Sequence, residues 1–255
     1  MVKGLKGITQ VSSSLTNRIR RKLICLRLRP IRVFCLHQIS PEYDPIRCCE
    51  GDWISEDSFI RTIKVLLKEY TFIPLSAARK KLEKDIIRLR NYAVLTFDDG
   101  YRSVLPTLKW LESQGIPYTL FLNGKYLDGQ SCSAHVLENA RRIDSSITVP
   151  ELSKGLYLNE KDIKGLSACV GSHGYEHLDA TQLAQSEFHS QLKMNIDLLK
   201  EFKSFYVPFH AYTWGRHDDK SDSILTELGL IPVLIDGQKN FNDPQIIHRE
   251  LLPAR

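Results

Sequence analysis

The chain has 255 residues, enough for one substantial hydrophobic core, and its 42% apolar and 25% charged residues are typical of a globular domain. Its formal net charge of +5 is unevenly distributed, because residues 1–32 hold nine Lys and Arg and no acidic residue. The rest of the chain carries 26 basic and 30 acidic residues. A slightly acidic body, and a basic arm without interleaved aromatic residues, argue against a nucleic-acid-binding protein.

Residues 1–30 form a basic N-terminal arm, distinct from the body at 31–255. Its apolar stretch, 23–28, is interrupted by Arg27, so neither a signal peptide nor a transmembrane helix is expected. The arm is interpreted either as a helix packed on the domain, with a solvated basic face, or as an amphipathic segment lying on an anionic membrane. We therefore expect a cytoplasmic protein, with peripheral contact at the inner membrane face as the second interpretation. The six cysteines contain no C-x-x-C pair, which fits reduced thiols.

Strand and helix signals alternate along the body. The expected strands are 31–36, 70–75, 93–97, 118–122, 168–171, 204–207, 232–235 and 245–248, and the expected helices are 55–67, 76–89, 104–114, 160–166, 181–202 and 221–228. This alternation predicts parallel βαβ units and a single-domain α/β barrel. Residues 124–158 do not fit the alternation and are interpreted as a long insertion, partly helical at 135–142, of the kind that shapes a binding site.

Polar residues follow several of the predicted strands. Asp98 and Asp99 come after one strand, His173 and His177 after another, and His37 after the first. In a (β/α) barrel the carboxyl ends of the strands form the active face, so these side chains are expected to meet in space.

One Asp and two His are a plausible three-ligand set for a divalent metal that keeps a position open for water. The remaining Asp would then accept a proton from that water. Each motif alone has an ordinary explanation, since an Asp pair also caps helices and histidines also pack in cores. The occurrence of both motifs at predicted strand ends favours metal-assisted hydrolysis.

The order of these motifs resembles the NodB-type polysaccharide deacetylases, carbohydrate esterase family 4. Residues 96–101 match the first motif of that family without a mismatch, 173–177 match its H-x-x-x-H motif, and the similarity extends from about 31 to 252. The resemblance implies a distorted (β/α)7 barrel, a divalent metal that is usually zinc, and removal of N- or O-acetyl groups from sugars. Carried over to this sequence, it implies that Asp99, His173 and His177 bind the metal and that Asp98 is the general base.

The third motif of the family is altered here. At 205–210, Tyr206 stands where Arg is often found and His210 where Gly is usual. Aromatic side chains pack on pyranose rings, so a wall of the sugar groove is expected from Phe209, Tyr212 and Trp214, with core packing as the alternative.

The late motif that supplies the general acid in this family is not evident here, so the sequence leaves the identity of the general acid open. His37 is the first candidate and His248 the second, with His210 and His217 weaker. We predict that the backbone N–H of Tyr101 helps to hold the oxyanion.

Arg249 in the last strand is expected to pair with Asp98 and keep it ionised and oriented, replacing the Arg missing at Tyr206. An Arg there, together with a His after the first strand, resembles a subgroup that includes poly-N-acetylglucosamine deacetylases.

The resulting hypothesis is a metal-dependent hydrolase, with metal-activated water as the nucleophile, that removes acetyl groups from an N-acetylated sugar, oligosaccharide or glycan precursor. Two alternatives stay open: a metal-dependent hydrolase of another non-peptide C–N bond, and a non-catalytic relative that binds glycan.

Overall fold

The computed structural model describes residues 29–48, 51, 53–84, 88, 90–202 and 206–253. The basic arm predicted at 1–30 lies outside the described residues except for Arg29 and Pro30, and Cys49 lies outside them too. Within the described residues, no helix is both long enough and apolar enough to cross a membrane.

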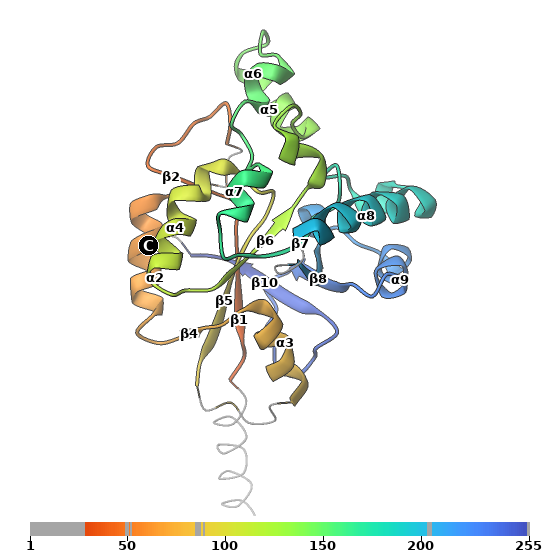
Figure 1. Ribbon diagram of the computed structural model, residues 1–255. Coiled ribbons are helices and arrows are strands. Elements are labelled where there is room, and N and C mark those ends of the chain that lie inside the picture. Colours follow the sequence, from red (N-terminus) through yellow and green to blue (C-terminus); the bar gives the residue numbers. More distant parts are fainter. Residues whose placement is uncertain are drawn as a thin grey trace, which may run out of the picture.

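Strands and helices alternate as expected (Figure 1). The strands are β1 (Arg32–Leu36), β2 (Gln38–Ser40), β3 (Trp53–Ser55), β4 (Thr71–Phe72), β5 (Tyr92–Phe97), β6 (Tyr118–Leu122), β7 (Cys169–Ser172), β8 (Tyr206–Ala211), β9 (Ile231–Ile235) and β10 (Ile247–Leu251). The α-helices are α2 (Glu56–Leu66), α3 (Leu75–Lys84), α4 (Leu105–Ser113), α5 (Ala134–Ile143), α6 (Val149–Ser153), α7 (Glu160–Lys164), α8 (Gln185–Leu199) and α9 (Asp219–Glu227).

Seven parallel strands close into a barrel in the order β1-β10-β9-β8-β7-β6-β5, and β5 returns to pair with β1. The short β4 pairs with the beginning of β5, outside this ring. The predicted single-domain (β/α)7-type barrel is confirmed. The small parallel sheet β2–β3 was not predicted from the sequence. The last strand was expected to begin at residue 245, whereas β10 begins two residues later, at Ile247.

Alternate side chains of each strand point to opposite sides of the barrel wall. On β1, Val33 belongs to a buried cluster shared by strands around the ring, which fills the interior. Phe34 and Leu36 instead join the cluster that contains Phe59 of α2 and Leu108 of α4. The inner side chains near the carboxyl ends of the strands are therefore available to build a site.

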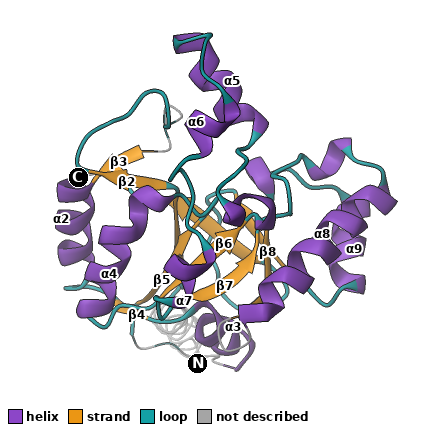
Figure 2. Cartoon of the chain, turned by 45° about the horizontal axis from the view of Figure 1, so that its top comes forward, coloured by secondary structure: helices purple, strands orange, loops and turns teal. Residues whose placement is uncertain are grey.

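The helices cover the outside of the barrel (Figure 2). In α2, the side chain of Ser55 caps the first turn by accepting a hydrogen bond from the N–H of Ser58, and Phe59 and Ile63 on one face are fully buried. This apolar face fixes the helix against β1 and β5, so the strand ends above it keep their positions.

Residues 124–158, the insertion, contain α5 and α6, which project from the same end of the molecule as the carboxyl ends of the strands (Figure 1). One aromatic stack joins the insertion to the segment after β5, with the ring centroid of Tyr157 5.3 Å from that of Tyr101, and a second stack within the insertion places Tyr126 5.0 Å from Tyr157. Val136 and Ala140 of α5 are fully buried in the same cluster. The insertion is thus packed on the segment that follows β5.

Candidate active site

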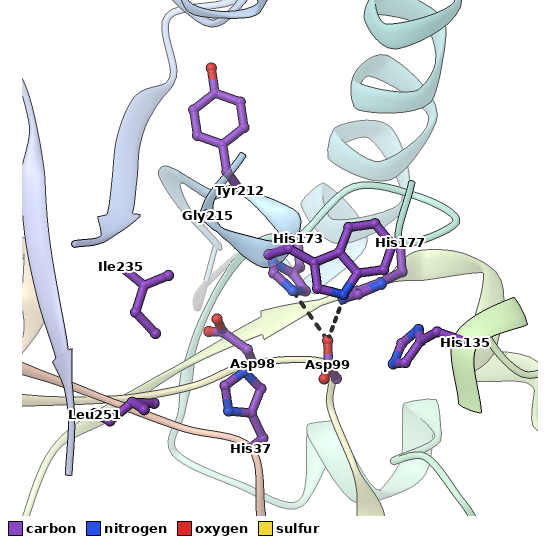
Figure 3. Close-up of a pocket in the computed structure, with 11 residues that line it drawn as sticks. His37, Asp98, Asp99, His135, His173, His177, Tyr212, Gly215, Ile235 and Leu251 are labelled. Carbon is purple, nitrogen blue, oxygen red and sulfur yellow. Dashed lines mark ion pairs between the residues drawn. The ribbon is translucent and has the colours of Figure 1, made fainter. Parts of the chain in front are cut away.

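Side chains from the carboxyl ends of the strands line a pocket of about 420 Å³ (Figure 3). The backbone hydrogen bonds between strands continue beyond the strand ends. The N–H of Asp98 donates to the carbonyl oxygen of Leu36 at 2.9 Å, and the N–H of His173 donates to that of Leu122 at 3.0 Å. These bonds bring together polar residues that are distant in the sequence. The lining includes His37, Asp98, Asp99, His173 and His177.

Asp99, His173 and His177 form a compact group in which one ligand atom from each residue lies within 4.8 Å of the others. Nε2 of His173 and Nε2 of His177 are each 3.1 Å from Oδ1 of Asp99 (Figure 3). All three side chains are buried. A carboxylate with two imidazoles is a common three-residue donor set for zinc in sites that keep one position open.

The surroundings of this group fit a cation. Nδ1 of His173 lies 2.8 Å from the carbonyl oxygen of Ala211, a bond that leaves Nε2 facing the pocket. Among the described residues, no donor is aligned for a hydrogen bond with the buried Oδ1 of Asp99, although the Nε2 atoms of His173 and His177 lie 3.1 Å from it. Burial would raise the pKa of Asp99, but the adjacent imidazoles of His177 and His173 hold that pKa well below its usual range. Burial lowers the pKa of His173, but Asp98 and Asp99 raise it overall. The site therefore calls for positive charge, which either protons or a divalent metal supply.

The backbone is strained at three residues that line the pocket. Asp99, His177 and Trp214 have φ values of 66°, 55° and 53°, and they are the three non-glycine residues with positive φ in the described chain. Such conformations are costly for L-residues and concentrate at functional sites, where the surrounding structure holds them in place.

Asp98 points to a different partner from its neighbour Asp99. Arg249 of β10 donates two hydrogen bonds to it, from Nη1 to Oδ1 at 2.6 Å and from Nη2 to Oδ2 at 2.8 Å, and a third to Thr96 Oγ1 at 3.1 Å. The thiol of Cys35 lies 3.4 Å from Oδ2. Burial alone would raise the pKa of Asp98, but the guanidinium of Arg249 lowers it below the usual value. Asp98 is thus a buried, ionised and oriented carboxylate.

Two of the predicted aromatic residues reach the pocket. Trp214 is 49% exposed and packs edge-on against the ring of His177 at 4.7 Å. Tyr212 is among the lining residues, but its ring points away from Asp98 and Asp99 (Figure 3), and its hydroxyl donates to Asp222 at 2.8 Å. Trp214 therefore keeps exposed surface at the pocket that can contact a ligand.

The structure does not bring Phe209 or Tyr101 side chains into the pocket. Phe209 is 1% exposed and packs in the barrel interior, because its position on β8 points inward below the site. Tyr101 is 1% exposed and stacks on Tyr157, so its ring supports the insertion.

Of the predicted acids, His37 lines the pocket beside Asp98. His248 does not, because it lies on the other face of β10 from Arg249 and its Nδ1 is 2.8 Å from Oδ2 of Asp236. His217 is held by Asp222, with Nδ1 3.1 Å from Oδ2. His210 is buried next to Phe188 of α8, with ring centroids 6.0 Å apart; it contacts Ser172, and burial lowers its pKa to about 3.

His135 was not among the predicted site residues, but it lies on α5 and lines the pocket (Figure 3). Burial, followed by the nearby His177, lowers the pKa of His135 to about 4, so its imidazole is neutral. A lone histidine in an insertion carries no local signal of such a role. The signal that existed was the insertion itself, which was expected to shape the site.

Two buried asparagines, also missed, hold the loop of the two histidines. Asn123 donates to the carbonyl oxygens of His173 at 2.6 Å and Gly174 at 3.0 Å. Asn195 of α8 donates to Leu122 O at 3.0 Å and to Ser172 Oγ at 2.9 Å. These bonds tie β6 and α8 to the end of β7, from which His173 extends.

Comparison with solved structures supports the fold assignment. IcaB from Ammonifex degensii superimposes with a TM-score of 0.70 at 21% identity, covering 88% of this chain and 92% of that one. The Streptococcus pyogenes deacetylase PplD gives 0.70 at 16% identity, with 89% and 94% covered. The BpsB deacetylase domain from Bordetella bronchiseptica gives 0.64 at 17% identity, with 87% and 95% covered.

No curated protein sequence matches the chain significantly. The family model described as polysaccharide deacetylase matches residues 88–233, which is more than half of the chain and spans both motifs of the pocket. The chain therefore belongs to the polysaccharide deacetylase family and is, by that membership, a carbohydrate deacetylase.

Proposed function

We propose that this protein is a metal-dependent hydrolase that removes the acetyl group from an N-acetylated sugar or oligosaccharide. Asp99, His173 and His177 would hold the metal, and the proposed ion is zinc because the donors are one carboxylate and two imidazoles. When bound there, a divalent metal polarises the acetyl carbonyl and lowers the pKa of water. The observation that carries the proposal is this buried donor group beside a separate ionised carboxylate, Asp98.

Asp98 acts as the general base in this proposal. Its pKa lies below the usual value, so it is ionised at neutral pH and can accept a proton from the attacking water. The two hydrogen bonds from Arg249 orient both of its oxygens. Because Arg249 is 1% exposed, water does not compete for this pairing.

His37 is the proposed general acid. Amide hydrolysis adds water to the acetyl carbonyl and breaks the C–N bond, so the leaving sugar nitrogen must gain a proton. His37 lines the pocket beside Asp98, while the other predicted candidates lie outside the lining. The backbone N–H of Tyr101 remains the proposed donor to the oxyanion.

The exposed face of Trp214 is proposed to pack on the sugar ring. Ile235 and Leu251 form an apolar wall elsewhere in the pocket (Figure 3). A cavity with apolar walls and a few convergent polar groups is the usual form of a small-ligand site.

Acetate release from N-acetylglucosamine oligomers by the zinc-loaded protein tests this proposal, with Asp98→Asn as the variant. We expect release by the wild type and a loss of at least about a hundredfold in Asp98→Asn, because the amide is not a base. Release that is unaffected by Asp98→Asn would remove Asp98 as the base. The absence of release from any acetylated sugar, alongside cleavage of another amide, would favour the alternative C–N hydrolase.

Peripheral contact of residues 1–30 with an anionic membrane, and a cytoplasmic location, stay predictions. Co-sedimentation with anionic vesicles tests the contact, and we expect deletion of residues 1–30 to abolish it. Binding that survives the deletion would contradict this prediction.

A further inference from the structure

We propose that His135 is a specificity-determining residue that hydrogen-bonds a hydroxyl of the acetylated pyranose, while Trp214 packs on the face of the same ring. This inference rests on the proposed function and deepens it. It assigns to the insertion the recognition of a sugar, which the metal group and the base alone do not provide.

His135 lies beside His177 and Trp214. Its ring centroid lies 4.7 Å from that of His177 and 5.7 Å from that of Trp214. His135 and the partly exposed Trp214 thus both lie against His177 and both line the pocket. A pyranose offers apolar C–H groups on its faces and hydroxyls around its edge. An aromatic face beside an imidazole edge matches both.

The two ring nitrogens of His135 are polar groups that a ligand can pair with. No hydrogen bond or ion pair joins either ring nitrogen to any residue in the described part of the chain, although the ring is partly buried. The residue also stands outside the three-residue donor group for the metal. An imidazole ring carries two polar nitrogens, and a partly buried ring gains by pairing them with a ligand.

Buried contacts hold α5, the helix that carries His135, in place. Ser133, which precedes the helix, lies with Oγ 3.1 Å from the hydroxyl of Tyr157, and its N–H donates to that hydroxyl at 3.3 Å. Tyr157 stacks on Tyr101, which is two residues after Asp99. His135 is therefore positioned relative to the carboxylates through buried contacts, as a specificity residue requires.

The test compares two substrates of the zinc-loaded protein: an N-acetylglucosamine tetramer and 4-methylumbelliferyl acetate, an acetyl ester without a sugar. For His135→Ala we expect kcat/KM to fall about tenfold on the tetramer and to stay within about twofold on the ester, since only the sugar contact is lost. His135→Asn, which keeps a donor and an acceptor, should recover part of the loss. His189→Ala, on the exposed face of α8 away from the pocket, is the matched control and should change neither.

Three results would overturn the inference: no change on the tetramer, an equal fall on both substrates, or weaker zinc binding by His135→Ala. If the wild type releases no acetate, the proposed function fails, and calorimetric binding of the tetramer decides the inference separately. A loss of affinity of about tenfold in His135→Ala would then support the sugar contact. Equal affinity, or no binding of the tetramer by the wild type, would refute it.

Discussion

Two neighbouring carboxylates, Asp98 and Asp99, differ in their surroundings at the scale of single residues. Asp99 adopts a left-handed backbone and faces two imidazoles, whereas Asp98 faces a guanidinium. A carboxylate bound to a dication stays ionised and is a poor base, while its neighbour off the metal can still accept a proton. The division of roles between the two acids therefore follows from their partners.

Replacement of Arg249 should move the acidic limb of the pH–rate profile. The base must be ionised, so kcat/KM falls as the pH drops through the pKa of Asp98. Without the guanidinium, burial raises that pKa, and we expect the acidic limb of Arg249→Ala to move to higher pH by about one to three units. Arg249→Lys, which keeps the charge, should shift it less.

Arg32→Ala is the matched control for this measurement. Arg32 of β1 pairs with Glu250 of β10, the neighbour of Arg249, through two hydrogen bonds, at 2.6 and 2.7 Å, and both side chains are partly exposed. Its removal should leave the pH profile unchanged. An unshifted acidic limb in both Arg249 variants would count against the pairing as the determinant of the Asp98 pKa.

At the scale of elements, the loop after β7 depends on β6 for its position. Asn123 follows β6 and donates to the carbonyl oxygens of His173 and Gly174. In Asn123→Ala we expect zinc affinity to fall about tenfold, because groups that support the ligands typically carry effects of this size. Competition with a chromophoric chelator measures this affinity directly.

Asn139→Ala provides the comparison, since Asn139 of α5 also donates to two carbonyl oxygens, of Pro45 and Cys48, each at 3.3 Å. That pair lies away from the metal group, so zinc affinity should not change. An equal loss of affinity in both variants would mean that Asn123 acts through general stability.

The elements that the sequence predicted best are those with a local signal. The buried apolar runs of β5 and β6 and the capped helix α2 lie where they were expected. The group of Asp99, His173 and His177 also comes together, because parallel strands bring their carboxyl ends to one face.

Long-range packing explains what the sequence did not reveal. The inward side of a strand cannot be told from its outward side before the barrel closes, so Phe209 was expected in the groove although it fills the interior. His135 reaches the pocket only because buried tyrosines hold α5 there. The prediction of Arg249 beside Asp98 came from the resemblance, and the structure has the two residues in contact.

At the scale of the whole molecule, closure of the barrel requires small residues where strands crowd the interior. A Cβ added to Gly171 of β7 would lie 2.7 Å from Cε1 of Phe121 and 3.0 Å from the carbonyl oxygen of Phe209. We expect Gly171→Ala to lower the free energy of unfolding by about 1–3 kcal/mol, through overpacking. Thermal unfolding measures this, at about 2–4 °C per kcal/mol for a chain of this size.

Gly165→Ala is the control, because a Cβ there meets only two backbone oxygens at 3.4 Å, an ordinary contact. Its melting temperature should stay close to that of the wild type. Equal melting temperatures for the two variants would show that the interior tolerates the extra methyl group.

The zinc content of the purified protein after reconstitution, measured for the wild type and the His173→Ala/His177→Ala double variant, shows directly whether the two histidines hold a metal. We expect about one zinc per wild-type chain and none in the variant, since removing two of three ligands leaves only a carboxylate. Circular dichroism confirms that the variant is folded. A folded wild type that binds no zinc or other divalent metal would contradict the account and make the two histidines structural.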